Sequence, residues 1–299
     1  MHRRRTFEIV GLGALTIITA ALAIAAVAAR PTVVTAIPAP VNLPTMDPST
    51  VWPSDTAKAP TTPPATPSTK STPTPTPAPT QTALNLPKNG LTALAKLLDA
   101  KQPGSILVLG DGSGDGADEW VALWVRDYLA KQHQVSYAAW NVQTGDYDAP
   151  TAYGSGGVTL TVWNASHGKP DLTVEPAHVD EAWRGADIVI YSYGHGQTSS
   201  ALTKALPAIR SAVRGHNGAI REIVMVQNPE RADSEVRQRA ATQTVQDWAD
   251  RAGLASLDIY SAFVADLRAR NQLVLQNGAP TPAGSALWAK TLNKALASR

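Results

Sequence analysis

Hydrophobic and polar positions follow two different patterns along the last two thirds of this chain. Short apolar runs typical of buried strands alternate with longer stretches whose apolar residues recur every three or four positions, as in amphipathic helices. The predicted strands cover residues 106–110, 135–139, 159–163, 186–193, 222–227 and 257–260. The predicted helices cover residues 118–132, 199–214, 235–252 and 281–297. Strands that alternate with helices predict a three-layer α/β fold with a mostly parallel sheet covered on both faces.

A different pattern occupies the first 30 residues. Arg3, Arg4 and Arg5 precede an apolar run from Ile9 to Ala29 that carries no charge. About 20 apolar residues are needed to cross a bilayer as a helix, whereas the apolar core of a secretory signal has roughly 7–15. We therefore predict a transmembrane anchor with a cytoplasmic N-terminus over residues 1–30. A cleaved signal peptide is the alternative, because small residues follow Ile24, and both interpretations place the rest of the chain outside the cytoplasm.

Residues 31–85 are dominated by proline, threonine, alanine and serine, most densely over residues 72–79. Such a segment buries too little apolar surface to offset the entropy lost on ordering. A proline-rich chain favours extended polyproline II and acts as a semi-rigid spacer. The sequence therefore predicts a disordered stalk, followed by a folded domain over residues 86–299.

The overall composition excludes several classes of function. The chain has 299 residues, a formal net charge of +2 and no cysteine. Disulfides, cysteine-bound zinc and thiol catalysis are therefore excluded. A net charge this close to zero, with scattered cationic residues, gives no indication of a nucleic-acid partner. The tryptophans on helical or near-helical segments (Trp120, Trp124, Trp183, Trp248 and Trp288) are expected to pack in the core.

The turn after the first predicted strand carries the main candidate chemistry. Residues 110–116 read Gly-Asp-Gly-Ser-Gly-Asp-Gly and lead into a helix, at the edge of an α/β sheet where ligands usually bind. A dinucleotide-binding loop is one alternative. Such a fold has an acidic residue at the end of its second strand, whereas this chain has Asn141 there. A calcium loop is another, although the twelfth position of an EF-hand would fall on Ala122. A looser cation site formed by Asp111, Asp115 and Asp118 is a third, and otherwise these carboxylates suit the first turn of a helix.

Four blocks in order resemble the SGNH (GDSL-type) hydrolases, over about residues 104–299. The blocks are Gly110-Asp111-Gly112-Ser113, residues 162–168 ending in His167-Gly168, residues 190–196 ending in Gly194-His195-Gly196, and residues 276–288 around Pro280-Thr281-Pro282. The resemblance implies a flavodoxin-like three-layer fold and ester hydrolysis. It also implies an oxyanion and ligand-binding region built from Gly112, Gly168, Gly194 and Gly196, with no cofactor and no metal.

The residues that perform the family's chemistry are substituted in this chain. Aligned on the fourth block, the family's aspartate falls on Gln276 and its histidine on Ala279. The nucleophile falls on Gly112, and the asparagine of the third block falls on Gly196. Serine hydrolysis needs a base within about 2.6–3.2 Å of the hydroxyl, oriented by a third group. The resemblance therefore implies a cleft that has lost its catalytic triad.

Three hypotheses for function follow. In the first, the domain is a pseudo-hydrolase that binds an acylated or carbohydrate ligand of the cell envelope without turnover. In the second, it is a divergent esterase in which Ser113 acts as nucleophile with His195 as base, although a serine one residue later lies about 3.8 Å away along the chain. In the third, it is a structural or protein-interaction module at the cell surface.

Overall fold

The computed structural model describes residues 88–299 except 101, 158, 169, 232–234 and 269. The predicted anchor over residues 1–30 and the predicted stalk over residues 31–85 lie outside the described residues. Within the described part, no helix has the length and apolarity needed to span a bilayer.

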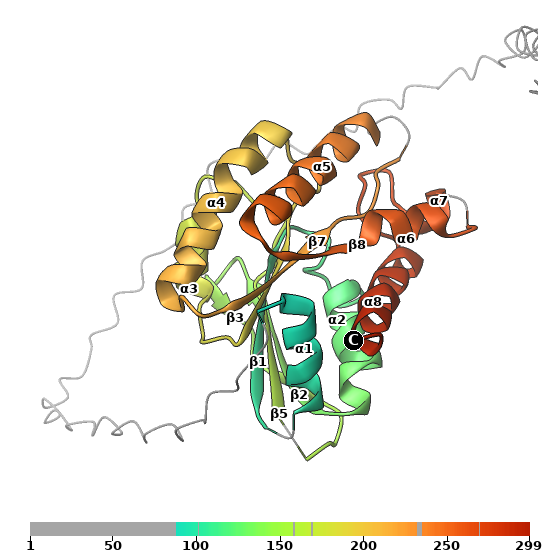
Figure 1. Cartoon of the computed structure of the whole chain (residues 1–299). Coiled ribbons are helices and arrows are strands. Elements are labelled where there is room, and N and C mark those ends of the chain that lie inside the picture. The colour runs from blue at the N-terminus through green and yellow to red at the C-terminus, as the bar shows by residue number, and fades with distance from the viewer. Residues whose placement is uncertain (1–87, 101, 158, 169, 232–234, 269) are drawn as a thin grey trace, which may run out of the picture. The chain divides into compact units, whose positions relative to one another are not determined.

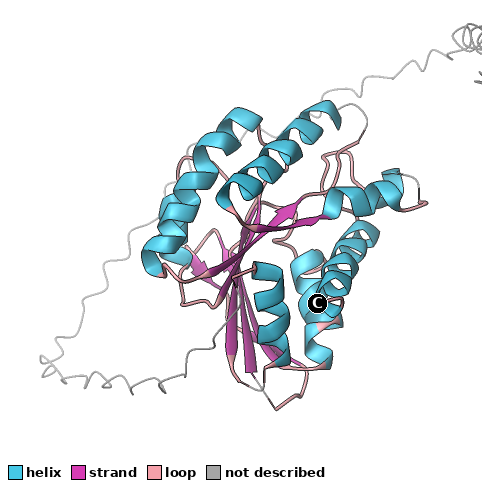
Figure 2. Ribbon diagram, viewed as in Figure 1, coloured by secondary structure: helices cyan, strands magenta, loops and turns pink. Residues whose placement is uncertain are grey.

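A single mixed sheet runs through the middle of the domain (Figures 1 and 2). Its strands are β1 Gly104–Gly110, β2 Gln134–Asn141, β3 Asp146–Tyr147, β4 Thr151–Tyr153, β5 Thr159–Asn164, β6 Ile188–Ser192, β7 Arg221–Val226 and β8 Ala255–Asp258. Their order is β3-β2-β5-β1-β6-β7-β8, and β4 also pairs with β2, on the edge that faces away from β5. The short strands β3 and β4 run antiparallel to β2, and every other pairing is parallel. The predicted mostly parallel sheet is therefore confirmed, with β1 at its centre.

Helices cover both faces of the sheet. One face carries α1 Gly90–Asp99, α2 Trp120–Asp127, α6 Ile259–Ala265, α7 Arg270–Leu273 and α8 Pro282–Ala297, with a short 3-10 turn at Leu129–Lys131. The other face carries α3 Glu175–Ala182, α4 Ser199–His216 and α5 Glu235–Ala252. Alternate residues of the central strand serve the two layers, because successive strand side chains point to opposite faces. Ile106 and Val108 pack under α2 and α8, and Leu107 and Leu109 pack under α4.

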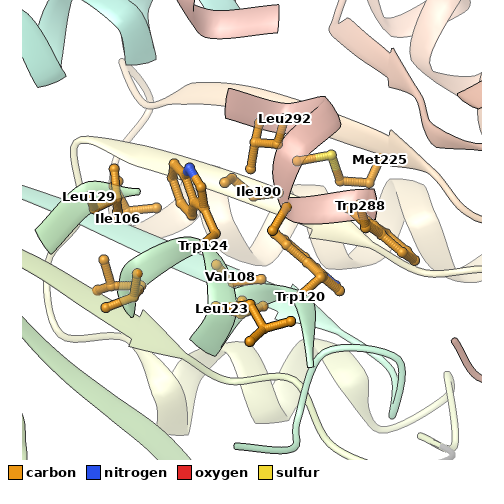
Figure 3. Close-up of a cluster of buried hydrophobic side chains, with 14 of the residues drawn as sticks. Ile106, Val108, Trp120, Leu123, Trp124, Leu129, Ile190, Met225, Trp288 and Leu292 are labelled. Carbon is orange, nitrogen blue, oxygen red and sulfur yellow. The ribbon is translucent and has the colours of Figure 1, made fainter. Parts of the chain in front are cut away.

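The layer under α2 and α8 is built around tryptophan (Figure 3). Trp120 and Trp288 are fully buried, and their rings stack at 5.3 Å between centroids with 2° between planes. Trp124 is equally buried beside them. Trp248 lies 6 % exposed on the opposite face, whereas Trp183 is only partly buried and stacks on His216. The tryptophans are therefore packing residues, as the sequence predicts.

Several element boundaries differ from those expected. The helix expected over 118–132 begins at Trp120 and ends at Asp127, because Tyr128 leaves helical geometry at φ −125° and ψ −58°. The strand expected over 257–260 ends at Asp258, whose carboxylate accepts the Ser261 N–H at 2.8 Å and so begins α6. The C-terminal helix begins as expected with Pro282 in its first turn, capped by Thr281. Helices α1, α3, α6 and α7 and the short strands β3 and β4 are not among the predicted elements.

Candidate functional site

Polar residues gather where the central parallel strands end. Strand β1 ends at Gly110 directly beside Ser192 at the end of β6, and Asn164 at the end of β5 pairs with Val108. Asp111, Asn164, Ser192 and Gln227 are each 1 % exposed or less. The carboxyl ends of parallel strands form the edge at which α/β proteins bind ligands. The sequence blocks therefore meet at one edge, as the resemblance implies.

Asp111 connects the residues of this cluster by hydrogen bonds. Its carboxylate accepts hydrogen bonds from the backbone N–H of Ser113 at 3.2 Å and of His195 at 3.0 Å, and from the Gln227 amide at 3.0 and 3.1 Å. Burial raises the pKa of Asp111 above its usual value, and the nearby His195 charge and these hydrogen bonds oppose the rise. The aspartate therefore ties the turn after β1 to the loops after β6 and β7.

Ser113 and His195, the candidate nucleophile and base, have separate partners. Ser113 is fully buried, and its Oγ accepts a hydrogen bond from Gln227 Nε2 at 3.2 Å. The Nε2–H of His195 donates to the carbonyl of Asn277 at 3.0 Å, and its Nδ1 lies 4.0 Å from Glu230 Oε1. Within the described part of the chain, no hydrogen bond joins Ser113 to His195. The serine faces inward toward Gln227, and the histidine faces the C-terminal loop.

The two backbone donors expected to form an oxyanion hole bind groups of the protein itself. The N–H of Gly112 donates to the carbonyl of Gly168 at 2.5 Å. The N–H of Gly168 donates to Asp115 Oδ2 at 2.7 Å. A Cβ atom at position 112 would lie 2.8 Å from the Gly168 oxygen, which is closer than such atoms approach. The loop after β5 therefore rests directly on the position where the family keeps its nucleophile.

Gly194 and Gly196 adopt backbone conformations that favour glycine, with φ of 140° and 68°. Gly194 lies against Gln227, since a Cβ there would be 3.2 Å from its Oε1. Gly196 is exposed and lines a groove of about 420 Å³. Its walls are the loop 170–176 and one face of α4, and they are mainly apolar. The remaining lining residues are Pro170, Asp171, Leu172, Thr173, Pro176, Gln197, Thr198, Ala201, Lys204, Ala205 and Ala208.

The fourth block forms a tight turn with no titratable side chain at the two aligned positions. The N–H of Leu275 donates to the carbonyl of Ala279 at 2.8 Å, and the N–H of Ala279 donates to Asn277 Oδ1 at 3.1 Å. Gly278 packs so closely on His195 that a Cβ there would lie 2.5 Å from its Cε1. The turn therefore covers the histidine instead of supplying one.

The acidic residues of the first block do not converge. Asp115 binds Gly168 N–H, Asp111 lies in the buried cluster, and Asp118 is exposed with Arg126 3.7 Å away. All three precede the first turn of α2, which contains no acidic residue. Among the described residues, no group of three or more His, Cys, Asp or Glu side chains is placed to hold a metal ion.

Sequence reasoning missed two groups of polar residues in this region. Gln227 is assigned no role from the sequence, yet its amide donates to Asp111, Ser113 and the Ser192 carbonyl. Glu175 is fully buried and accepts hydrogen bonds from His167 Nε2 at 2.9 Å and the Tyr193 hydroxyl at 2.6 Å. Burial and the Glu175 charge raise the pKa of Tyr193 well above its usual value. A glutamate in a short polar helix gives no sequence signal of such burial.

Comparison with known proteins identifies only structural neighbours. No protein-family model and no curated protein matches the sequence. A two-domain esterase active on acetylated mannans is similar with a TM-score of 0.52 and 14 % identity, over 72 % of this chain and 54 % of its own. A peptidoglycan O-acetylesterase is similar with a TM-score of 0.51 and 10 % identity, over 70 % of this chain and 95 % of its own. A lipase/acylhydrolase from Enterococcus faecalis has a TM-score of 0.47 and 12 % identity, over 64 % of this chain and 94 % of its own. At such identities the likeness establishes the fold alone.

Proposed function

We propose that this chain, whose described part has the SGNH/GDSL-type fold, is a catalytically degenerate member of that structural class. In this proposal it binds an acylated or carbohydrate ligand of the cell envelope without turning it over. The observation that carries the proposal is the contact between Gly112 N–H and the Gly168 carbonyl at 2.5 Å. An oxyanion hole works only when its donors point at the developing negative charge of the substrate. Here the first donor is occupied by a carbonyl of the protein.

The absence of a positioned base supports the same conclusion. A general base must lie within hydrogen-bond reach of the proton that it removes. Ser113 Oγ accepts from Gln227, and His195 Nε2 is engaged by the Asn277 carbonyl. The aligned positions Gln276 and Ala279 carry an amide and a methyl group. Binding is then the function that remains for the cleft.

The groove beside Gly196 supports the class of ligand. Its volume of about 420 Å³ is within the range of small-molecule sites, and its mainly apolar walls suit an acyl group. Two structural neighbours with TM-scores above 0.5 are an esterase active on acetylated mannans and a peptidoglycan O-acetylesterase. We therefore propose O-acetylated glycans as the first ligands to test. The uncharged run from Ile9 to Ala29 supports anchoring of the chain outside the cytoplasm.

The catalytic part of the proposal is tested by hydrolysis of p-nitrophenyl acetate and butyrate by the full chain in neutral detergent. We expect no saturable turnover above that of the Ser113→Ala variant. Fluorophosphonate labelling of the same samples should give no signal. Saturable hydrolysis or labelling that disappears in Ser113→Ala would overturn the proposal in favour of an active esterase.

The binding part is tested by calorimetric titration with O-acetylated manno-oligosaccharides and O-acetylated chito-oligosaccharides. Ala208→Trp is the matching variant, because Ala208 is an exposed residue in the wall of the groove. We expect binding of an acetylated series, weaker binding after chemical deacetylation, and loss of binding in Ala208→Trp. If neither series binds, the proposed ligand class is wrong, and a structural or protein-interaction role becomes the better explanation.

A further inference from the structure

A second pocket lies at the opposite edge of the sheet, where α4 and α5 end and β7 and β8 begin. It has a volume of about 260 Å³ and is lined by four cationic side chains: Lys88, Arg210, Arg214 and Arg221. Glu222 is the one carboxylate among the lining residues described. The other lining residues are Gly218, Ile220, Gly253, Leu254 and Ala255. Four cations around one carboxylate leave a formal excess of three positive charges at the pocket.

The buried carboxylate holds two of the guanidinium groups in place. The side chain of Glu222 is 3 % exposed. It accepts hydrogen bonds from Arg210 Nε at 3.0 Å and Nη2 at 3.1 Å, and from Arg214 Nη1 at 3.1 Å. The hydroxyl of Tyr191 on β6 donates to the same carboxylate at 3.0 Å. The carboxylate thus fixes both guanidinium groups before any ligand arrives, which lowers the entropy that binding would cost.

Three of these side chains keep donors that bind no group in the described part of the chain. Arg210 Nη1, Arg214 Nε and Lys88 Nζ make no hydrogen bond or ion pair with any described residue. Arg214 Nη2 donates to the Gly218 carbonyl at 2.7 Å, which orients its guanidinium plane. The side chains of Arg210 and Arg214 line the pocket and are 25 % and 43 % exposed, so a ligand can reach them. Three side chains that line one pocket therefore each keep a donor with no partner among the described residues.

Structural roles account for only part of this charge. Glu222 neutralises one cation, and the carbonyl ends of α4 and α5 together supply roughly one further negative charge. Lys88, Arg210 and Arg214 together therefore carry roughly one positive charge more than these groups offset. Guanidinium groups match the geometry of phosphate oxygens, and an ammonium adds a compact charge beside them.

We propose that this pocket is a binding site for a phosphate group, separate from the cleft and independent of the function proposed for it. The pocket has the volume of roughly nine water molecules, enough for a tetrahedral phosphate with part of the group it is attached to. The phosphate is supplied by a lipid headgroup or by a soluble or polymeric phosphate ester. Both present the same oxygens to Arg210, Arg214 and Lys88.

The soluble source is tested by calorimetric titration of the full chain in neutral detergent with glycerol 1-phosphate, with glycerol as the uncharged comparison. We expect binding of the phosphate ester alone, weakened by a rise in salt because the charges are partly exposed. Lys88→Gln and Arg214→Gln should each weaken binding about three- to tenfold. Arg214→Gln leaves the bidentate Arg210 pair on Glu222 intact, so the domain should still fold, which thermal unfolding checks. Lys294→Gln, which changes an exposed lysine of α8 on the other face of the sheet, is the matched control and should change nothing.

The lipid source is tested by hydrogen exchange of the last turns of α4 in the full chain reconstituted in vesicles. Protection with phosphatidylglycerol but not with phosphatidylcholine alone, removed by Lys88→Gln, assigns the site to an anionic lipid. Binding of glycerol 1-phosphate without such protection assigns it to a soluble or polymeric ester. Absence of both effects, or equal effects in Lys294→Gln, would overturn the proposal.

Discussion

Replacement of Gly112 by serine would restore the residue that the family uses as nucleophile, and we predict that it destabilises the domain without creating an esterase. The new Cβ would lie 2.8 Å from the Gly168 oxygen and 3.1 Å from the Gly168 Cα. Both are backbone atoms, so a side-chain rotation cannot relieve the contact. The loop after β5 must move, and the hydrogen bond from Gly112 N–H to Gly168 is weakened or lost with it.

The magnitude follows from these two effects. Overpacking costs about 1–3 kcal/mol, and loss of one hydrogen bond costs about 0.5–1.5 kcal/mol. We therefore expect Gly112→Ser to lower the free energy of unfolding by about 2–4 kcal/mol. For a domain of this size the melting temperature should fall by about 5–15 °C. Hydrolysis of p-nitrophenyl acetate should stay at background even when Gln276→Asp and Ala279→His are added, because Gly196 still supplies no side-chain oxyanion donor and the Gly168 N–H donates to Asp115.

Gly168→Ala is the matched control, since it changes a glycine in the same contact. A Cβ at position 168 meets no atom within 4 Å, and its backbone is not in the left-handed region. We expect a change within about 0.5 kcal/mol, as for other substitutions that disturb no packing. Urea unfolding followed by tryptophan fluorescence measures both variants. Equal stability of Gly112→Ser and the unmodified chain, or saturable activity of the triple variant, would refute the argument that the loop closes this site.

Three further predictions concern stability. Glu119 accepts the Gly116 N–H at 2.8 Å, and burial, together with the nearby Asp115 charge, raises its pKa from 4.5 to about 7. Because the folded state holds this proton more tightly, the free energy of unfolding should fall by about 1–2 kcal/mol as pH rises from 4.5 to about 7. Glu119→Gln should flatten that part of the pH profile of urea unfolding. A profile of unchanged slope in Glu119→Gln would contradict this assignment. Trp288→Ala should cost about 3–5 kcal/mol, because it removes a fully buried ring stacked on Trp120, whereas Trp183→Ala on the partly buried site should cost clearly less in the same measurement. Gln227→Leu should cost about 1–3 kcal/mol, because the buried Asp111 carboxylate loses the two hydrogen bonds that the Gln227 amide donates. A cost that did not depend on pH below neutrality would show that Asp111 is not the group affected.

The sheet could be predicted from the sequence because each central strand is an uninterrupted apolar run between turn residues. Ile106–Leu109 and residues 186–193 carry this signal plainly, and their parallel pairing follows from the helices between them. Helix α1 could also have been predicted from the sequence, because Asn89 is a typical N-cap residue and Leu91, Leu94 and Leu97 repeat at helical spacing. Helix α3 had none, because its eight residues are mostly polar and include Pro176.

The site was predictable only as a set of positions. The four blocks located the edge of the sheet, and the substitutions at Gly112, Gln276 and Ala279 followed from their alignment. The contact between Gly112 and Gly168 was not predictable from the sequence. It depends on the relative positions of two loops that follow the paired strands β1 and β5 and are 56 residues apart in the chain. The role of Gln227 also depended on this arrangement, since its amide reaches Asp111 only after β6 has paired with β7.

The central position of β1 bears on how this domain would carry mechanical load. The chain enters the domain through α1 and passes directly into β1, which is hydrogen-bonded to β5 on one side and to β6 on the other. In the proposed tethered arrangement, tension between the stalk and a ligand held at the carboxyl edge pulls β1 along its own axis. The hydrogen bonds on both sides then share the force at once, in shear, and do not open one after another. A domain held in this way would resist extraction of its first strand even when the short helix in front of it is pulled away.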